Sequence, residues 1–271
     1  MRNKTIDKDI ALNEEKKFIK IKKTFLKIIS SNLNIESKIN KKIIFIVGLP
    51  RSGTTLVHQL IDTSKEIDGL GESSILDKNF SKLLKDNSKS NNSLLEAGRN
   101  IIDEYNNLSS KKIIIDKLPI NFYWIGFIKL MFPNSKVIHV KRNLKDVFLS
   151  LYKNNFGNNQ MDWCYDESNI LFFIKNYIEI MNFWKSRYEN FIFDLQYENL
   201  INNQIEVSTK LFKFCDIKWD KKIFDFYKSG KRINTASISQ VKKSIYNTSI
   251  DSNKKYIKKM SFLKKLEKIK I

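Results

Sequence analysis

The sequence of 271 residues lacks several features that would place it in common classes of protein. It has two cysteines, Cys164 and Cys215, so we expect reduced thiols and no disulfide framework. It has no run of 18 apolar residues, so no integral membrane segment is expected. Residues 1–20 are charged throughout and lack the apolar core of a signal peptide. We therefore expect a cytoplasmic protein.

Metal-ligand spacing is also missing from the sequence. The two histidines, His58 and His139, stand in segments that predict a helix and a strand, and no cluster of His, Cys, Asp and Glu surrounds them. Packed side chains are the better interpretation of both. We therefore predict that the protein holds no metal ion.

The charge of the chain is strongly one-sided. Lys and Arg number 49 against 29 Asp and Glu, which gives a formal net charge of +20. Such an excess can indicate nucleic acid or membrane partners. However, Lys, Asn and Ile are abundant everywhere, and no segment pairs a basic stripe with stacking aromatics. We interpret the excess as solvated surface with a local role in holding anions, and we expect no nucleic acid partner.

One stretch organises the chain. Residues 43–47 are apolar and predict a buried parallel strand, and residues 56–61 have the apolar spacing of a helix. Gly48 and Gly53 bound the turn between them and allow the backbone to fold tightly. Several N–H groups and the helix N-terminus can then face one anion, which is the layout of a phosphate-binding loop.

This loop lacks the lysine of a nucleoside-triphosphate loop. In such a loop the second glycine is followed by Lys and then Ser or Thr. Here Thr54 and Thr55 follow Gly53, and the positive charge stands earlier, at Arg51. The pattern suits a nucleotide with one phosphate in the loop and a reactive group beside Arg51. The alternative is an ordinary strand-to-helix turn without a ligand, which the coincidence of all these residues disfavours.

Strands alternate with helices along the rest of the chain, which predicts an α/β fold with a central parallel sheet flanked by helices. Ligands of such sheets lie outside the carboxyl ends of the strands. We divide the chain into an N-terminal amphipathic helix and linker, residues 1–40, and a main domain, residues 41–271. The expected strands are 43–47, a region ending at 67, 113–115, 136–140 and 191–195.

The loop resembles the 5′-phosphosulfate loop of sulfotransferases that use 3′-phosphoadenosine 5′-phosphosulfate (PAPS). The likeness is greatest to the tyrosylprotein and bacterial sulfotransferases and covers roughly residues 40–256. It implies a P-loop-like sulfotransferase fold, with PAPS as the cofactor and 3′,5′-adenosine bisphosphate (PAP) as its product. The loop residues that the resemblance assigns to the cofactor are Pro50, Arg51, Ser52, Gly53, Thr54 and Thr55.

A second anion site is indicated after the strand 136–140. Arg142 and Ser150, eight residues apart, resemble the family's 3′-phosphate site. Eight helical residues are just over two turns, so Ser150 points to a similar side as the start of its helix. Arg binds phosphate bidentately and Ser adds a hydroxyl. The alternative is a surface Arg with an unrelated helical Ser.

The resemblance also implies three catalytic residues. Glu72, 21 residues after Arg51, stands where tyrosylprotein sulfotransferases have their catalytic base; the alternative is a carboxylate in the first turn of a helix. Lys117 resembles the lysine that stabilises charge on the bridging oxygen, and Arg51 would assist it. A solvated lysine at a strand end is the alternative for Lys117. Asp116 resembles the magnesium aspartate of an ATPase and supports a rival function.

Two further segments extend the resemblance toward the nucleotide. Tyr197 opens a Tyr-Glu-x-Leu segment that shapes the nucleotide pocket in the family, although a plain turn after a strand could also account for it. Ser239 lies in a segment that resembles the loop closing over the cofactor. The chain departs from the family there, because Ser252 and Asn253 stand where relatives usually have Arg-Trp.

Three functions follow in order of preference. The first is a sulfotransferase that moves the sulfuryl group of PAPS to an acceptor hydroxyl, in a protein tyrosine, an acidic peptide, a glycan or a small alcohol. The second is a magnesium-dependent, kinase-like phosphotransferase on the same fold class. The third is a non-catalytic basic binding module.

Overall fold

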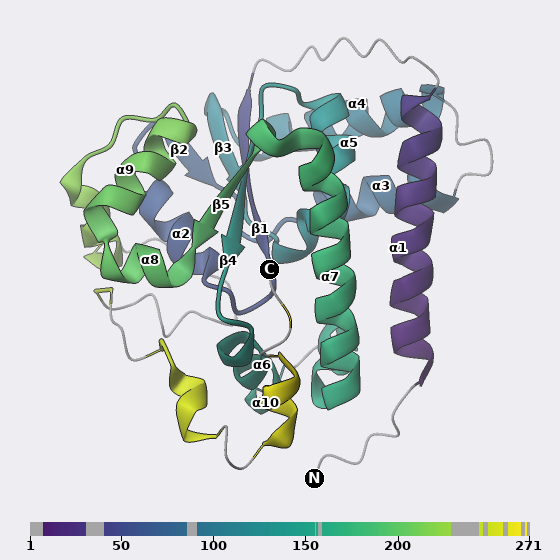
Figure 1. Cartoon of the computed structure of the whole chain (residues 1–271). Coiled ribbons are helices and arrows are strands. Elements are labelled where there is room, and N and C mark those ends of the chain that lie inside the picture. Colours follow the sequence, from purple (N-terminus) through teal and green to yellow (C-terminus); the bar gives the residue numbers. More distant parts are fainter. Residues whose placement is uncertain are drawn as a thin grey trace.

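The computed structural model describes residues 8–30, 41–85, 91–154, 156, 159–228, 244–245, 249–256, 260–266 and 269 (Figure 1). Its centre is a five-stranded parallel sheet in the order β2-β3-β1-β4-β5, which confirms the expected α/β class. The strands are β1 (Lys42–Gly48), β2 (Ile67–Gly69), β3 (Ile113–Asp116), β4 (Lys136–Lys141) and β5 (Ile192–Gln196).

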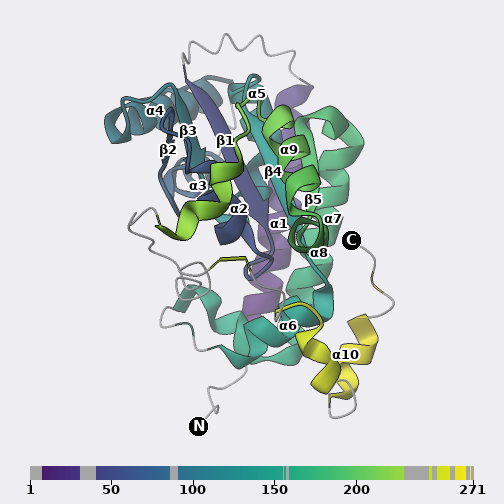
Figure 2. The same ribbon diagram turned by 90° about the vertical axis from the view of Figure 1, so that its left-hand side faces the viewer.

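Helices cover both faces of this sheet (Figures 1 and 2). On one face lie α2 (Thr54–Ile61), α8 (Tyr197–Asn202), α9 (Gln204–Phe214) and the 3-10 helix η4 (Lys221–Lys228). The other face carries α1 (Lys8–Ile29), α3 (Ile75–Lys85), α4 (Asn91–Leu108), η1 (Pro119–Trp124), α5 (Ile125–Met131) and α7 (Glu167–Tyr188). The remaining elements are α6 (Leu144–Lys153), η2 (Asn159–Tyr165), η3 (Glu189–Phe191), η6 (Ser252–Lys255) and α10 (Ser261–Lys265).

Strand β1 is apolar at nearly every position because it is buried on both faces. Successive side chains of a strand alternate between the faces of its sheet. Ile43, Phe45 and Val47 therefore enter the core beneath α1, α3 and α7, whereas Ile44 and Ile46 enter the core beneath α2 and α9. Two separate hydrophobic cores thus hold the central strand in place, and the loop that follows it starts from a rigid position.

Helix α1 is integrated into the main domain. Its residues Phe18, Ile21, Phe25 and Ile28 are buried, and the Phe25 ring meets the Trp184 ring edge-on at a centroid distance of 4.9 Å. The sequence predicts an amphipathic helix in this region, and the structure shows that its apolar face packs on the main domain. The division of the chain at residue 40 stays a prediction.

The structure corrects two of the expected elements. The second strand does not end at Ile67 but begins there and runs to Gly69, where it pairs with Ile115. The sequence also predicts a helix over residues 121–131. The helical segment starts earlier, as a 3-10 helix at Pro119, a residue well suited to a first helical turn because it has no N–H to satisfy. In the described part of the chain, no helix has the length and hydropathy needed to cross a membrane.

Candidate functional site

The loop Leu49–Gly53 links β1 to α2 at the carboxyl edge of the sheet. A Cβ atom on Gly48 would lie 2.5 Å from the carbonyl oxygen of Val140, so this position requires glycine. Arg51 has a φ of 73°, in the left-handed region that non-glycine residues rarely adopt. A residue keeps such a conformation only when the surrounding contacts hold it there, and residues of this kind are common at functional sites.

Gly53 has a φ of 104° and lies against the ring of Tyr197, so an added Cβ would be 2.3 Å from Cδ2 of that ring. We predict that Gly53→Ala lowers the free energy of unfolding by on the order of 1–2 kcal/mol because of the backbone conformation. The clash with Tyr197 should lower it by about 1–3 kcal/mol more. Gly71→Ala is the matched control, because Gly71 also has a positive φ, 71°, but has open space where the Cβ would go. Urea unfolding measures both, and equal losses would contradict the close packing of Tyr197 on the loop.

Two buried polar atoms beside the loop have no hydrogen-bond partner among the described residues. They are the Oγ of Ser52, whose residue is 1% exposed, and the Nε of Arg142, whose residue is 9% exposed. A buried donor without a partner costs free energy. Hydroxyl and guanidinium donors are the groups that bind phosphate oxygens. The residues present therefore fit a phosphate-bearing ligand at this edge.

Arg51, Ser150 and Arg142 come together in the structure. Nε of Arg51 donates to Oγ of Ser150 over 3.0 Å, and Nη1 of Arg142 donates to the backbone carbonyl of Arg51 over 3.1 Å. The sequence predicted Arg142 and Ser150 as a pair on one side of α6. In the structure both contact Arg51, which joins the predicted second anion site to the loop in one cluster.

Tyr197 lies between the loop and Arg142. The guanidinium of Arg142 stands over the Tyr197 ring, 4.6 Å from its centroid, which is a cation–π geometry. Nη2 of Arg142 also donates to the carbonyl of Ser249 over 2.6 Å, and the Tyr197 and Ser249 hydroxyls are 2.9 Å apart. Tyr197 opens helix α8 rather than the plain turn that the sequence left as an alternative.

Sequence reasoning missed Asp146, which anchors the segment after Ser249. Its carboxylate accepts hydrogen bonds from the backbone N–H groups of Asp251 and Asn253, the Ser252 hydroxyl and the Asn253 amide, all within 2.9 Å. The available signal, an acidic residue in the first turn of α6, indicates only a favourable helix dipole. Ser252 and Asn253, where the chain departs from the family, are thus packed residues, while Ser239 lies outside the described part of the chain.

Glu72 and Lys117 form an ion pair at the ends of neighbouring strands. Glu72 follows β2 and Lys117 follows β3, and the backbone N–H of Lys117 donates to the carbonyl of Gly71 over 2.9 Å. The Lys117 side chain is fully buried, whereas that of Glu72 is 38% exposed. Burial lowers the pKa of Lys117, and the carboxylates of Glu72 and Asp116 partly offset that effect.

Asp116 points to the opposite face of the sheet from α2. It is paired in register with Phe45 and accepts hydrogen bonds from the Tyr105 hydroxyl at 2.6 Å and the Asn121 amide at 3.0 Å. Burial raises its pKa to about 7, although these hydrogen bonds and Lys117 favour the ionised form. Both carboxylate oxygens of Asp116 accept hydrogen bonds on the face of the sheet away from the loop. Asp116, the residue that supported a magnesium-dependent phosphotransferase, is therefore not placed to hold a metal ion beside the loop. Across the described residues, no group of three or more His, Cys, Asp and Glu could hold a metal ion.

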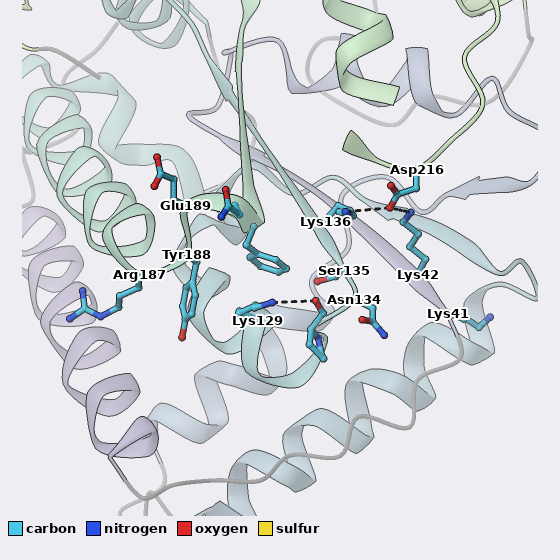
Figure 3. Close-up of a pocket in the computed structure, with 13 residues that line it drawn as sticks. Lys41, Lys42, Lys129, Asn134, Ser135, Lys136, Arg187, Tyr188, Glu189 and Asp216 are labelled. Carbon is cyan, nitrogen blue, oxygen red and sulfur yellow. Dashed lines mark hydrogen bonds and ion pairs between the residues drawn. The ribbon is translucent and has the colours of Figure 1, made fainter. Parts of the chain in front are cut away.

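Among the cavities lined by described residues, two lie at opposite edges of the sheet. One of about 750 Å³ is lined by the first residues of β1 and β4 and by the end of α7, where Asp216 pairs with both Lys42 and Lys136 (Figure 3). The other, of about 350 Å³, includes Arg142 and Gln196 at the carboxyl edge. Ligands of parallel α/β sheets lie at the carboxyl edge, so we place the functional site at the smaller cavity and the loop.

Comparison with known proteins shows the family to which the chain belongs. A family model described as the sulfotransferase family matches residues 44–106 and 99–221, so the chain belongs to the sulfotransferase family. An uncharacterized protein of Aquifex aeolicus (strain VF5) is 33% identical over an alignment of 237 residues that covers 81% of this chain. The match covers 31% of the relative, so the chain spans about a third of the length of that protein.

Solved structures share the fold. The sulfotransferase domain of the Synechococcus PCC 7002 olefin synthase matches with a TM-score of 0.58 at 17% identity, over 88% of this chain and 100% of that one. The sulfotransferase domain of the curacin biosynthetic pathway matches with a TM-score of 0.54 at 18% identity, over 83% and 96% of the two chains. Mouse SULT7A1, complexed with PAP, matches with a TM-score of 0.50 at 16% identity, over 83% of each chain.

Proposed function

We propose that this protein transfers the sulfuryl group of PAPS to the hydroxyl of an acceptor. The observation that carries the proposal is the cluster of Arg51, Ser150 and Arg142 beside a loop that lacks the triphosphate lysine. The pairing of Glu72 with Lys117 near the same edge supplies a base and a cation for the chemistry. Membership of the sulfotransferase family supports the reaction class.

The loop and its neighbours would hold the nucleotide. The residues that we assign to the 5′-phosphosulfate are Pro50, Arg51, Ser52, Gly53, Thr54 and Thr55. Arg142 and Ser150 would bind the 3′-phosphate, with Tyr197 packed against Arg142. Ser239, which lies outside the described residues, would by the family resemblance belong to the cofactor-binding set. When bound, PAPS would supply the activated sulfuryl group and leave as PAP.

Three side chains would carry the transfer. The Glu72 carboxylate would accept the proton of the acceptor hydroxyl, because a neutral hydroxyl is a weak nucleophile. Lys117 would stabilise the negative charge that develops on the leaving phosphate oxygen, and its burial strengthens this electrostatic effect. Arg51 would orient the transferring group beside the loop. The acceptor would be a protein tyrosine, an acidic peptide, a glycan or a small alcohol.

Ligand-induced stabilisation tests the choice of nucleotide. We predict that PAP raises the melting temperature of the protein more than ATP with magnesium does, because the loop has Arg51 and Thr54 in place of the triphosphate lysine. In Arg142→Ala the stabilisation by PAP should shrink, while Arg187→Ala, on an exposed arginine at the opposite edge, should leave it unchanged. Equal or greater stabilisation by ATP would overturn the proposal in favour of the phosphotransferase.

A further inference from the structure

An aspartate that the proposed chemistry does not use ties the C-terminal part of the chain to helix α6. Asp146 is 1% exposed, and its Oδ1 accepts from the Ser252 hydroxyl at 2.9 Å and from the backbone N–H and side-chain amide of Asn253 at 2.9 and 2.8 Å. Its Oδ2 accepts the backbone N–H of Asp251 at 2.9 Å. Figure 2 shows this part of the chain, in yellow, beside α6. Four donors from three successive residues thus meet one buried carboxylate.

The backbone of this segment has a conformation that requires support. Asp251 has a φ of 58°, in the left-handed region that non-glycine residues rarely adopt. A residue in that region keeps its conformation only when its contacts determine it. The hydrogen bonds from the N–H groups of Asp251 and Asn253 to Asp146 are such contacts, and a charged acceptor makes them stronger than neutral ones. The conformation of residues 249–253 therefore depends on Asp146.

The same segment contacts the guanidinium of Arg142. The carbonyl of Ser249, two residues before Asp251, accepts from Nη2 of Arg142 at 2.6 Å. On the other side, Nη1 of Arg142 donates to the carbonyl of Arg51 over 3.1 Å, and the Tyr197 ring covers one face of the guanidinium. These contacts fix the plane of the guanidinium. Its Nε is buried, has no hydrogen-bond partner among the described residues, and so remains for a ligand.

Helix α6 supports both sides of this cluster. Asp146 and Ser150 are four positions apart, so they lie one above the other on the same face of the helix. Ser150 accepts from Nε of Arg51 in the loop at 3.0 Å, whereas Asp146 holds the segment that carries Ser249. The helix therefore fixes the loop and the segment relative to each other, and Arg142 donates to a backbone carbonyl of each.

We propose that Asp146 is a positioning residue for Arg142. It holds residues 249–253 in the conformation in which the Ser249 carbonyl orients the guanidinium for an anion. Asp146 acts through this segment and touches no reacting atom. The identification of the anion as the 3′-phosphate of PAP rests on the proposed function, whereas the path of hydrogen bonds from Asp146 to Arg142 does not.

Asp146→Asn tests the proposal, because it keeps the size of the side chain and removes its charge and one of its acceptor oxygens. We expect the affinity for PAP to fall by about tenfold, as the loss of one hydrogen bond to a charged group predicts. The affinity for adenosine 5′-monophosphate (AMP), which lacks the 3′-phosphate, should stay near the parental value. Calorimetry measures both affinities. Equal losses for PAP and AMP, or parental affinity for both, would overturn the proposal.

Asp166→Asn is the matched control. It makes the same chemical change at a carboxylate that accepts a backbone N–H at the start of α7, from Asn169 over 2.8 Å, and both affinities should remain parental. A second comparison uses Arg142→Ala as the background. Asp146→Asn should not weaken PAP binding further there, because the residue through which it acts is gone. An undiminished loss in that background would contradict the assigned path.

Ser252→Ala is a milder variant, because it removes one of the four donors and leaves the other three. It should lower PAP affinity in the same direction and to a smaller extent. If Asp146→Asn does not fold, parental PAP affinity in Ser252→Ala overturns the proposal.

Urea unfolding tests the same path without a ligand. If the parent protein fails to bind PAP, the proposed function fails, and this measurement decides whether Asp146 and Arg142 are coupled. The stability losses from Asp146→Asn and Arg142→Ala should be non-additive in the double variant, because residues in one hydrogen-bond network are coupled. Additive losses would overturn the proposal.

Discussion

Replacing Glu72 with glutamine is expected to lower turnover by about 10²- to 10⁴-fold, the usual contribution of a general base. Glutamine keeps the size of the side chain and an oxygen that can accept from Lys117, but it cannot take the proton of the acceptor. PAP binding should stay nearly parental, because Glu72 lies outside the cluster formed by Arg51, Ser150 and Arg142. Steady-state kinetics with any acceptor found, beside PAP calorimetry, measures the two effects separately.

Glu104→Gln is the matched control for this change. Glu104 is also a partly exposed carboxylate paired with a lysine, Lys78 at 3.3 Å, but it lies on α4, away from the loop. Its replacement should leave turnover parental. If Glu72→Gln behaved in the same way, Glu72 would be a structural carboxylate near the start of α3, worth about 0.3–1 kcal/mol through the helix dipole, and the base would have to be sought elsewhere.

Replacing Lys117 with methionine is expected to lower turnover by about 10²- to 10³-fold, the effect of removing one preorganised group that stabilises transition-state charge. Methionine fills the buried space of the lysine stem without the charge. Lys42→Met serves as the control, because Lys42 is a half-buried lysine paired with Asp216 at the opposite edge of the sheet. Equal turnover of the two variants would contradict the role of Lys117.

The pH dependence of turnover should also distinguish Lys117→Met from the parent protein. Burial holds the pKa of Lys117 below the ordinary lysine value of 10.5, so its charge is lost as the pH rises through that lowered pKa. Turnover of the parent should therefore fall on the alkaline side before ordinary lysines titrate. The alkaline decline should be absent from Lys117→Met, whose residual turnover does not depend on that charge.

The sheet and the loop could be predicted from the sequence because their signals are local. The apolar run at 43–47 predicts a doubly buried strand, and Gly48 and Gly53 mark the turn. Strand boundaries were less accurate: the region expected to end at Ile67 is where β2 begins, because the pairing with β3 decides its extent. Three residues of weak apolar pattern give no such information by themselves.

The contacts of the site could not be predicted, because they depend on tertiary structure. No local pattern indicates that Lys117 is fully buried or paired with Glu72, since 45 positions separate the two residues. The hydrogen bonds of Asp146 and Ser249 could not be predicted either. An Asp in a helix and a Ser in a polar segment are common, and neither forms a distinctive sequence pattern. His139 was expected to be a packed side chain, and the structure adds its hydrogen bonds to Tyr177 and Asp194.

Product analysis by mass spectrometry tests sulfuryl transfer most directly. The protein is incubated with PAPS and a mixed library of tyrosine peptides, glycans and small alcohols, and in parallel with ATP and magnesium. We expect a sulfated product from the parent, much less from Glu72→Gln, and no phosphorylated product from the ATP reaction. A phosphorylated product with ATP, together with an unmodified library in the PAPS reaction, would contradict the proposed function.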